Sequence, residues 1–231
     1  YHALMNWARW DFFAPESLLT PDGRRVMWAW CTPWVNDMQK VGRKQDFDAL
    51  MEGKIQPGIQ SLPRELNLPK DGMLRIKPLR ELEQLRSNQK QEANITIKDD
   101  APYVLKDISG DTMELEITFA VPSSSKFGVR VLCGEDGTNG FTITAGSMRK
   151  TLTVGYTKPP FELQQGEDLT LRVFIDKSMI EVFINDRQAA VAWHDYDPKD
   201  LHVSLFCKDG NVEVKTVIAW EMKAIYEVDS R

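Results

Sequence analysis

The chain has 231 residues, 42% of them hydrophobic, and a formal net charge of −5 at pH 7. This length suits one large or two modest domains, and the hydrophobic content is enough to bury a core. The acidic balance and the absence of Lys/Arg blocks exclude nucleic acid and a membrane as expected partners, because anionic partners are bound through basic clusters. No apolar run approaches the roughly 20 residues that are needed to span a bilayer.

Cysteine and histidine residues are few and scattered. They form no Cys-x-x-Cys pair and no His pair at the spacing of a zinc site, so we expect buried thiols, no metal and no cofactor. The residues concerned are Cys31, Cys133, Cys207, His2, His194 and His202.

The first part of the chain is predicted to form two hairpins. Two β-like runs within residues 10–34 flank a Thr-Pro-Asp-Gly turn, whose Gly tolerates positive φ. Residues 35–58 are polar with a weak helical pattern, and they indicate an excursion from the sheet. A strand over residues 59–68 is ended by Pro69, and an Asp-Gly turn leads into a further strand at residues 73–76.

A short helix is expected to link the two parts of the chain. Pro78 stands at a first helical position, and Leu79, Leu82 and Leu85 follow at helical spacing. The pattern predicts an amphipathic helix, which we assign to residues 78–90. Its leucine stripe is interpreted as a docking face between two domains.

Beyond residue 90 the pattern is uniformly β. Met113, Leu115, Ile117 and Phe119 are separated by polar residues, which is the period-two alternation of a strand with one buried face. Similar runs recur with Asp-Gly, Asn-Gly or Asn-Asp turn signals between many of them, and no parallel βαβ rhythm is present. The runs are residues 129–133, 141–144, 151–156, 169–175, 180–184, 189–193, 203–207 and 212–220. We predict an antiparallel sandwich, and a lectin-like jelly roll would give the same strand pattern.

Three segments in a fixed order carry a family resemblance. They are Asp-Phe-Phe-Ala-Pro-Glu at residues 11–16, Arg-Arg-Val-Met-Trp-Ala-Trp at residues 24–30 and Ser-Leu-Pro-Arg-Glu-Leu at residues 61–66. This part of the chain resembles the closing part of the catalytic domain of glycoside hydrolase family 32, the β-fructosidases. Residues 174–186 are similar to a hairpin of that family's C-terminal sandwich, with Arg187 where relatives often have Gly.

The resemblance implies an all-β fold class, in which the end of a five-bladed β-propeller is followed by an antiparallel β-sandwich. The expected domains are the last blade with its closing strands at residues 1–77, the linker helix at 78–90 and the sandwich at 91–231. Family members carry a nucleophile Asp, a stabilising Asp and an acid/base Glu in motifs that these residues lack. We therefore expect the catalytic residues upstream of Tyr1 and a chain that is inactive alone.

Four residues are candidates for contact with a sugar. By the resemblance, Asp11 lies near the central pocket of the propeller, although a structural role at a strand start is an equally good interpretation. Phe13 stands where the family has a Tyr or Phe that lines the fructose pocket, and it lacks the hydroxyl. Glu16 adds a charge where many relatives carry Gln. Trp28 and Trp30 share a strand face and favour core packing as a pair, while the resemblance moves Trp30 toward the pocket.

Other charged residues are interpreted as structural. Arg64 and Glu65 are expected to form an internal ion pair that locks the blade to the sandwich. Asp176, Ser178 and Glu181 surround a tight hairpin, where we expect them to cap the turn or to face solvent.

The first hypothesis is the C-terminal portion of a β-fructosidase that hydrolyses sucrose, sucrose phosphate or fructan by a retaining mechanism, without a metal or organic cofactor. The expected partners are a fructose-containing saccharide, the missing N-terminal propeller blades and, through exposed sheet edges, a second copy of the chain. The alternative is a non-catalytic carbohydrate-binding or interaction module, which exposed aromatic residues on one sandwich face would favour. The sequence leaves cytoplasmic and secreted locations open.

Overall fold

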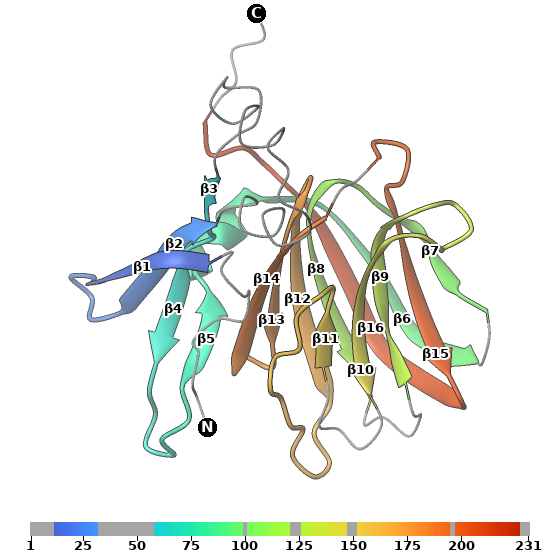
Figure 1. The fold of residues 1–231 in the computed structure, drawn as a ribbon, viewed down its shortest axis with the longest axis horizontal. Coiled ribbons are helices and arrows are strands. Elements are labelled where there is room, and N and C mark those ends of the chain that lie inside the picture. Colours follow the sequence, from blue (N-terminus) through green and yellow to red (C-terminus); the bar gives the residue numbers. More distant parts are fainter. Residues whose placement is uncertain are drawn as a thin grey trace, which may run out of the picture.

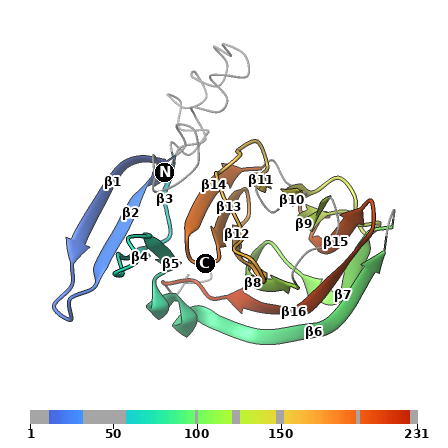
Figure 2. The same cartoon turned by 90° about the horizontal axis from the view of Figure 1, so that it is seen from below.

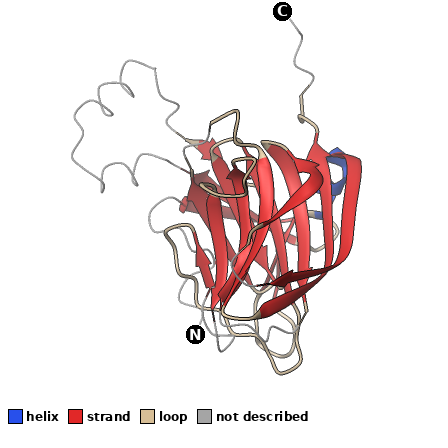
Figure 3. Cartoon of the chain, turned by 90° about the vertical axis from the view of Figure 1, so that its right-hand side faces the viewer, coloured by secondary structure: helices blue, strands red, loops and turns tan. Residues whose placement is uncertain are grey.

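The computed structural model describes residues 12–31, 58–98, 101–120, 126–146, 152–194 and 197–226. In these residues the strands form three sheets, and one short helix is present (Figure 3). The predicted all-β class is confirmed. The predicted excursion lies outside the described residues, apart from Gly58 at its end.

Two of the sheets form a sandwich (Figure 1). A six-stranded sheet has the order β14-β13-β12-β8-β16-β6, and a five-stranded sheet has the order β11-β10-β9-β15-β7. The strands are β6 (Arg86–Lys98), β7 (Tyr103–Ser109), β8 (Thr112–Phe119), β9 (Lys126–Cys133), β10 (Phe141–Gly146), β11 (Leu152–Val154), β12 (Leu169–Asp176), β13 (Met179–Ile184), β14 (Gln188–Trp193), β15 (His202–Lys208) and β16 (Asn211–Met222).

The period-two pattern explains the core of the sandwich. Leu115, Ile117 and Phe119 of β8 are fully buried, as are Phe127 and Val129 of β9 in the other sheet. The rings of Phe119 and Phe127 lie 5.1 Å apart across the two sheets. Burial of apolar surface is the main driving force of folding, so the sandwich has a sufficient core of its own.

The linker helix is shorter than the sequence predicts. It is a 3₁₀ helix, η1 (Arg80–Leu85), and residues 86–90 belong to β6. β6 is difficult to predict because only Ile95 and Ile97 of its 13 residues are buried, while the others lie partly or fully in solvent at the edge of the sheet.

The third sheet is small and comes from the first part of the chain. β1 (Phe12–Leu19) and β2 (Arg25–Cys31) form the first predicted hairpin. β2 also pairs with β3 (Ile59–Gln60) and β4 (Arg64–Asn67), and β4 pairs with β5 (Arg75–Pro78). The second predicted hairpin therefore exists, and it shares a sheet with the first.

The strand predicted at residues 59–68 is interrupted between β3 and β4. The N–H of Ser61 donates to the carbonyl of Ala29 at 2.8 Å, and the Ser61 hydroxyl accepts the Ala29 N–H at 3.0 Å. Pro63 has no N–H to offer the ladder, so regular pairing with β2 resumes only at Arg64.

The small sheet packs on the outer face of the six-stranded sheet, beside β12, β13 and β14 (Figure 2). Leu82 of η1 and Ile76 of β5 are buried in one cluster with Phe174, Phe183 and Ala189 of the sandwich. The leucine stripe of the linker thus docks the two parts on each other, as its spacing indicates.

A hairpin of the sandwich adds a backbone contact to this docking. Asn185 and Asp186 both have positive φ, and the Arg187 N–H donates to the carbonyl of Ile184 at 2.9 Å, which defines a type I′ turn. The Asp186 carbonyl accepts the N–H of Ile76 of β5 at 2.7 Å. The hairpin therefore stays tight although Arg187 replaces the Gly that is frequent in relatives.

Candidate functional site

An exposed aromatic pair lies on the face of the small sheet that is opposite to the sandwich. Phe13 of β1 and Trp30 of β2 are paired across the strands, and their ring centroids lie 6.3 Å apart with an interplanar angle of 69°. Their exposed fractions are 54% and 44%. Cys31, the neighbour of Trp30, is buried against the sandwich, so the tryptophan points the other way. The two rings meet edge to face and offer apolar surface to solvent.

The other predicted sugar contacts belong to the same hairpin. Glu16 is exposed and pairs with Trp28 across the strands, beyond a bulge at which Ala14 has a φ of +46°. Trp28 is half-buried while Trp30 is exposed, so packing explains only the first of the two tryptophans. Asp11 lies outside the described residues.

A buried arginine lies behind this face. Arg64 of β4 is completely buried, and its guanidinium lies 4.5 Å from the ring centroid of Phe12 and 5.1 Å from that of Phe183. It forms an ion pair with Glu181 of β13, whose other carboxylate oxygen accepts the N–H of Leu62 at 2.6 Å. This cluster joins β1 and β4 to the sandwich.

The predicted ion pair between Arg64 and Glu65 is wrong. Neighbouring residues on a strand point to opposite faces, and only Arg64 faces the sandwich. Glu65 pairs instead with Arg24 at 3.0 Å and with Arg80 at 2.9 Å. The arginine does lock the small sheet to the sandwich, but through Glu181.

The interpretation of Glu181 as a turn cap or solvent-facing residue is also wrong, because Glu181 is buried. Asp176 is exposed, which agrees with the expectation that it faces solvent. Glu181 is 3% exposed. Burial raises the pKa of Glu181, and the positive charge of Arg64 acts in the opposite direction. Because both carboxylate oxygens accept hydrogen bonds, the ionised form is the one that the contacts favour.

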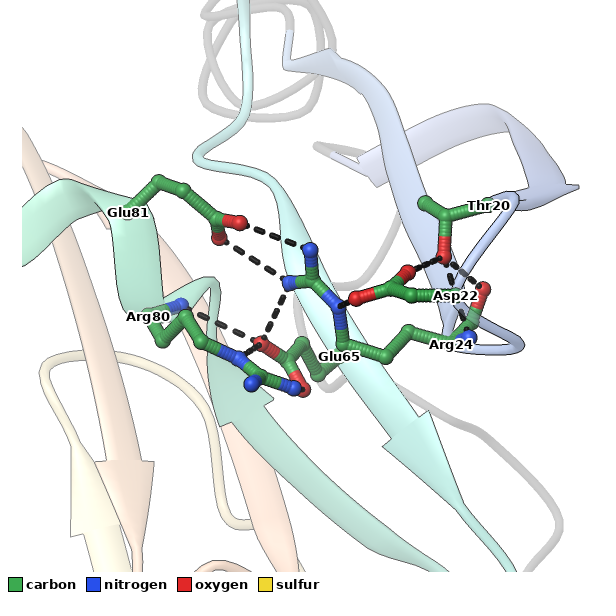
Figure 4. A network of polar contacts seen from close by, with 6 residues as sticks. All are labelled: Thr20, Asp22, Arg24, Glu65, Arg80 and Glu81. Carbon is green, nitrogen blue, oxygen red and sulfur yellow. Dashed lines mark hydrogen bonds and ion pairs between the residues drawn. The ribbon is translucent and has the colours of Figure 1, made fainter.

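A polar network holds the β1–β2 hairpin to β4 and η1 (Figure 4). Arg24 donates to both carboxylate oxygens of Glu81, at 3.0 and 2.7 Å, to Glu65 at 3.0 Å and to Asp22 at 2.7 Å. Glu65 also accepts from the Nε of Arg80 at 2.9 Å. One arginine thus connects a turn, a strand and the linker helix.

These contacts favour the ionised form of the Glu65 and Glu81 carboxylates. The hydrogen bond from Arg80 lowers the pKa of Glu65, and the hydrogen bond from Arg24 lowers the pKa of Glu81. A general acid in glycoside hydrolysis needs a raised pKa, so these groups suit positioning and not proton donation. As partly exposed ion pairs they contribute modestly to stability and are screened by salt.

A polar cavity of about 620 Å³ lies between the small sheet with η1 and the outer face of the sandwich. Side chains of both charges line it, including those of Glu65, Lys77, Arg80, Glu116 and Arg172. Five acidic and three basic residues line the cavity, so its charges are mixed and it does not present a field of one sign to an ion.

The described part of the chain contains no group of three or more His, Cys, Asp or Glu side chains that could hold a metal ion. Cys31, Cys133 and Cys207 are buried and form no disulfide, as expected. Within the same residues, no helix is long and apolar enough to cross a membrane.

Sequence reasoning names Phe13 and Trp30 and expects an internal charge at Arg64, but it misses Glu181 as the partner of Arg64. The available signal is in β13, where Met179 and Phe183 stand two positions before and after Glu181. Three side chains on one strand face share their surroundings, so a glutamate between two large apolar residues indicates a covered face and a buried partner.

Comparison with known proteins agrees with this architecture. Residues 81–221 match the family model described as "Glycosyl hydrolases family 32 C terminal". A sucrose-6-phosphate hydrolase of Escherichia coli is 29% identical over 220 residues, covering 92% of this chain and 42% of its own length. A levanase of Bacillus subtilis (strain 168) is 27% identical over 246 residues, covering 94% of this chain and 34% of its own. The chain spans less than half the length of these relatives.

Solved structures share the fold. Fructan 1-exohydrolase IIa from Cichorium intybus has a TM-score of 0.75 at 20% identity, covering 95% of this chain and 49% of that one. Sucrose-6-phosphate hydrolase from Lactobacillus gasseri has a TM-score of 0.68 at 19% identity, covering 94% of this chain and 42% of that one. A small propeller-type sheet docked on a β-sandwich thus defines the C-terminal architecture of a class of glycoside hydrolases. The chain belongs to glycoside hydrolase family 32.

Proposed function

We propose that this chain is the C-terminal portion of an enzyme that cleaves β-D-fructofuranosyl linkages in sucrose, sucrose phosphate or fructan. The exposed pair of Phe13 and Trp30 carries the proposal, because it lies on the hairpin that the family resemblance assigns to the fructose pocket. The names of the relatives, among them a raffinose invertase of Escherichia coli 30% identical over 219 residues, support a fructose-containing saccharide as the partner.

The proposed roles follow from the chemistry of the side chains. Sugar rings present C–H faces that pack on aromatic rings and hydroxyl groups that need polar partners. Phe13 and Trp30 form the apolar wall, while Asp11 and Glu16 supply carboxylate acceptors for the sugar hydroxyl groups.

The proposed reaction is a retaining double displacement. A carboxylate attacks the anomeric carbon of the fructosyl unit while an acid protonates the leaving oxygen, and water then releases fructose as the same acid residue, now a base, takes the water proton. The family's motifs for these carboxylates do not occur in the chain, so we place them in preceding propeller blades. No metal or organic cofactor takes part, and the chain alone is inactive.

The division of labour that we propose follows the predicted domains, with the last blade at residues 1–77, the linker at 78–90 and the sandwich at 91–231. The sandwich supports the blade through the buried pair of Arg64 and Glu181. The exposed β1, with Leu19 62% exposed, is the surface on which the preceding blades pack. Without them, the same edge is a site for self-association.

The first test measures fructose released from sucrose, levan and inulin by the purified chain and by the full-length gene product. Fructose from the full-length product alone supports the proposal, and fructose from the chain itself contradicts the placement of the catalytic carboxylates. In the full-length product, Trp30→Ala should lower kcat/KM by about tenfold or more, because one wall of the sugar site is lost. Tyr103→Ala removes an exposed aromatic residue of the sandwich and is the matched control.

The alternative function, a carbohydrate-binding module, requires an aromatic platform on the sandwich. In the part of the sandwich that the structure describes, the exposed aromatic residues are Tyr103, which donates to Glu92 at 3.0 Å, and Tyr226, beyond the last strand. This arrangement does not favour the alternative. Isothermal titration of the chain with fructan tests it, since binding that persists in Trp30→Ala would require a separate site.

A further inference from the structure

The buried ion pair lies directly behind the proposed sugar wall. Phe12 and Phe13 are consecutive on β1, so their side chains point to opposite faces of the small sheet. Phe12 packs toward the sandwich, with the guanidinium of Arg64 at 4.5 Å from its ring, while Phe13 faces outward against Trp30. A shift of Phe12 therefore moves Phe13 through the shared backbone.

Glu181 determines where the guanidinium lies. Its carboxylate is anchored in β13, which is paired on both sides within the six-stranded sheet, and it accepts hydrogen bonds from Arg64 and from the Leu62 N–H. The planar guanidinium is thereby fixed between the rings of Phe12 and Phe183. A planar, delocalised cation suits such stacking better than an ammonium group.

We propose that Glu181 is a positioning residue for the sugar wall. Through Arg64 and Phe12, this glutamate of the sandwich sets the position of Phe13 against Trp30, so the sandwich shapes the fructoside site without touching the substrate. The inference extends the proposed function and depends on it for the kinetic part of its test.

A second buried glutamate provides a matched control. Glu114 of β8 is completely buried and accepts hydrogen bonds from Arg86 at 2.8 Å and from Arg172 at 2.6 and 2.9 Å. The contacts of Glu114 stay within the sandwich strands β6, β8 and β12. Glu114→Gln should lower stability as Glu181→Gln does, but it should leave the positions of Phe13 and Trp30 unchanged.

The first experiment uses the chain itself. The emission of Trp30 is obtained as the difference between the chain and its Trp30→Phe variant, and its quenching by acrylamide is measured. We expect Glu181→Gln to shift this emission and to increase its quenching, and Glu114→Gln to leave both unchanged. Phe12→Leu keeps the ion pair and removes only the stacked ring, and it should shift the emission and increase the quenching in the same way. This second variant decides the test if Glu181→Gln does not fold.

The second experiment uses the full-length gene product with sucrose as the substrate. Glu181→Gln and Phe12→Leu should lower kcat/KM by roughly tenfold to a hundredfold, mostly through KM, since a misplacement of about 1 Å can cost that much. Arg64→Lys should lower kcat/KM as well, because lysine keeps the charge but lacks the planar guanidinium group. An equal rise of KM in Glu114→Gln would overturn the proposal.

The two parts of the test separate the two claims. If the full-length product releases no fructose from any substrate, the proposed function fails, while the Trp30 emission still decides the positioning role. If folded Glu181→Gln and Phe12→Leu chains retain the Trp30 emission of the wild type, the positioning role fails, whatever the activity.

Discussion

The sandwich and the small sheet are built from the same kind of antiparallel strands, yet they are stabilised differently. Both sheets of the sandwich bury one face in a shared core. Cys31 and Ile76 of the small sheet instead belong to clusters that include Val191 and Phe183 of the sandwich, and the outer side of β1 is open. The small sheet therefore depends on the sandwich for the burial of these residues, whereas the sandwich also has a core of its own.

The largest expected effect comes from the core of the sandwich. Phe119→Ala should lower the free energy of unfolding by about 3–5 kcal/mol, because it removes a fully buried ring and leaves a cavity. Since the small sheet depends on the sandwich, both parts should lose protection together in hydrogen exchange. A small sheet that stays protected in this variant would show that it does not depend on the sandwich.

A smaller and more selective effect is expected at the docking surface. Leu82→Ala removes a side chain that is 5% exposed and lies between the small sheet and the sandwich, at a cost of about 2–4 kcal/mol. Amides of β4 and β5 should then exchange faster, while those of β8 and β12 keep their protection. Equal loss in both regions would show that they form one cooperative unit.

A turn of the small sheet allows a still finer test. Gly72 has a φ of +74°, and a Cβ added there would meet no atom within 4 Å. Gly72→Ala should therefore cost only the backbone strain, about 1 kcal/mol, measured by urea unfolding. Gly166→Ala is the matched control in a sandwich loop, with a φ of +79° and equally open surroundings. A larger loss of unfolding free energy in Gly166→Ala would show that the sandwich loop tolerates the backbone strain less well than the turn of the small sheet.

The smallest effect concerns pH. The pKa of Glu65 is lowered from its ordinary value of 4.5, mainly by the hydrogen bond from Arg80, so its contribution to stability is present above pH 4.5 and is lost as pH falls through the lowered pKa. Glu65→Gln should flatten the dependence of unfolding free energy on pH below about 4.5. Glu213→Gln, at an exposed position of β16 outside the network, serves as the control. If the slope of unfolding free energy against pH is unchanged in Glu65→Gln, the network around Glu65 is not the source of this pH dependence.

The sequence predicts the sandwich well because period-two patterns report burial on one face directly. The assignment of Phe13 and Trp30 to a sugar site stays a prediction, which rests on the family resemblance of their segments. Arg64 and Glu181 are 117 positions apart, and no local pattern shows which buried charge will meet another across two sheets. Glu65 shows the same limit, because its partners depend on how η1 and the first hairpin are placed.

The long edge strand β6 has a consequence for the behaviour of the chain in concentrated solution. A flat, unpaired edge would offer a template to other chains, as in amyloid growth. β6 is not flat, because Asn88 and Asn94 have φ values of +48° and +55° and the pairing with β16 shifts near the first of them. Exposed Lys90 and Lys98 add charge to the same strand. We therefore expect the 13 residues of this edge strand to be a poor template for fibril growth.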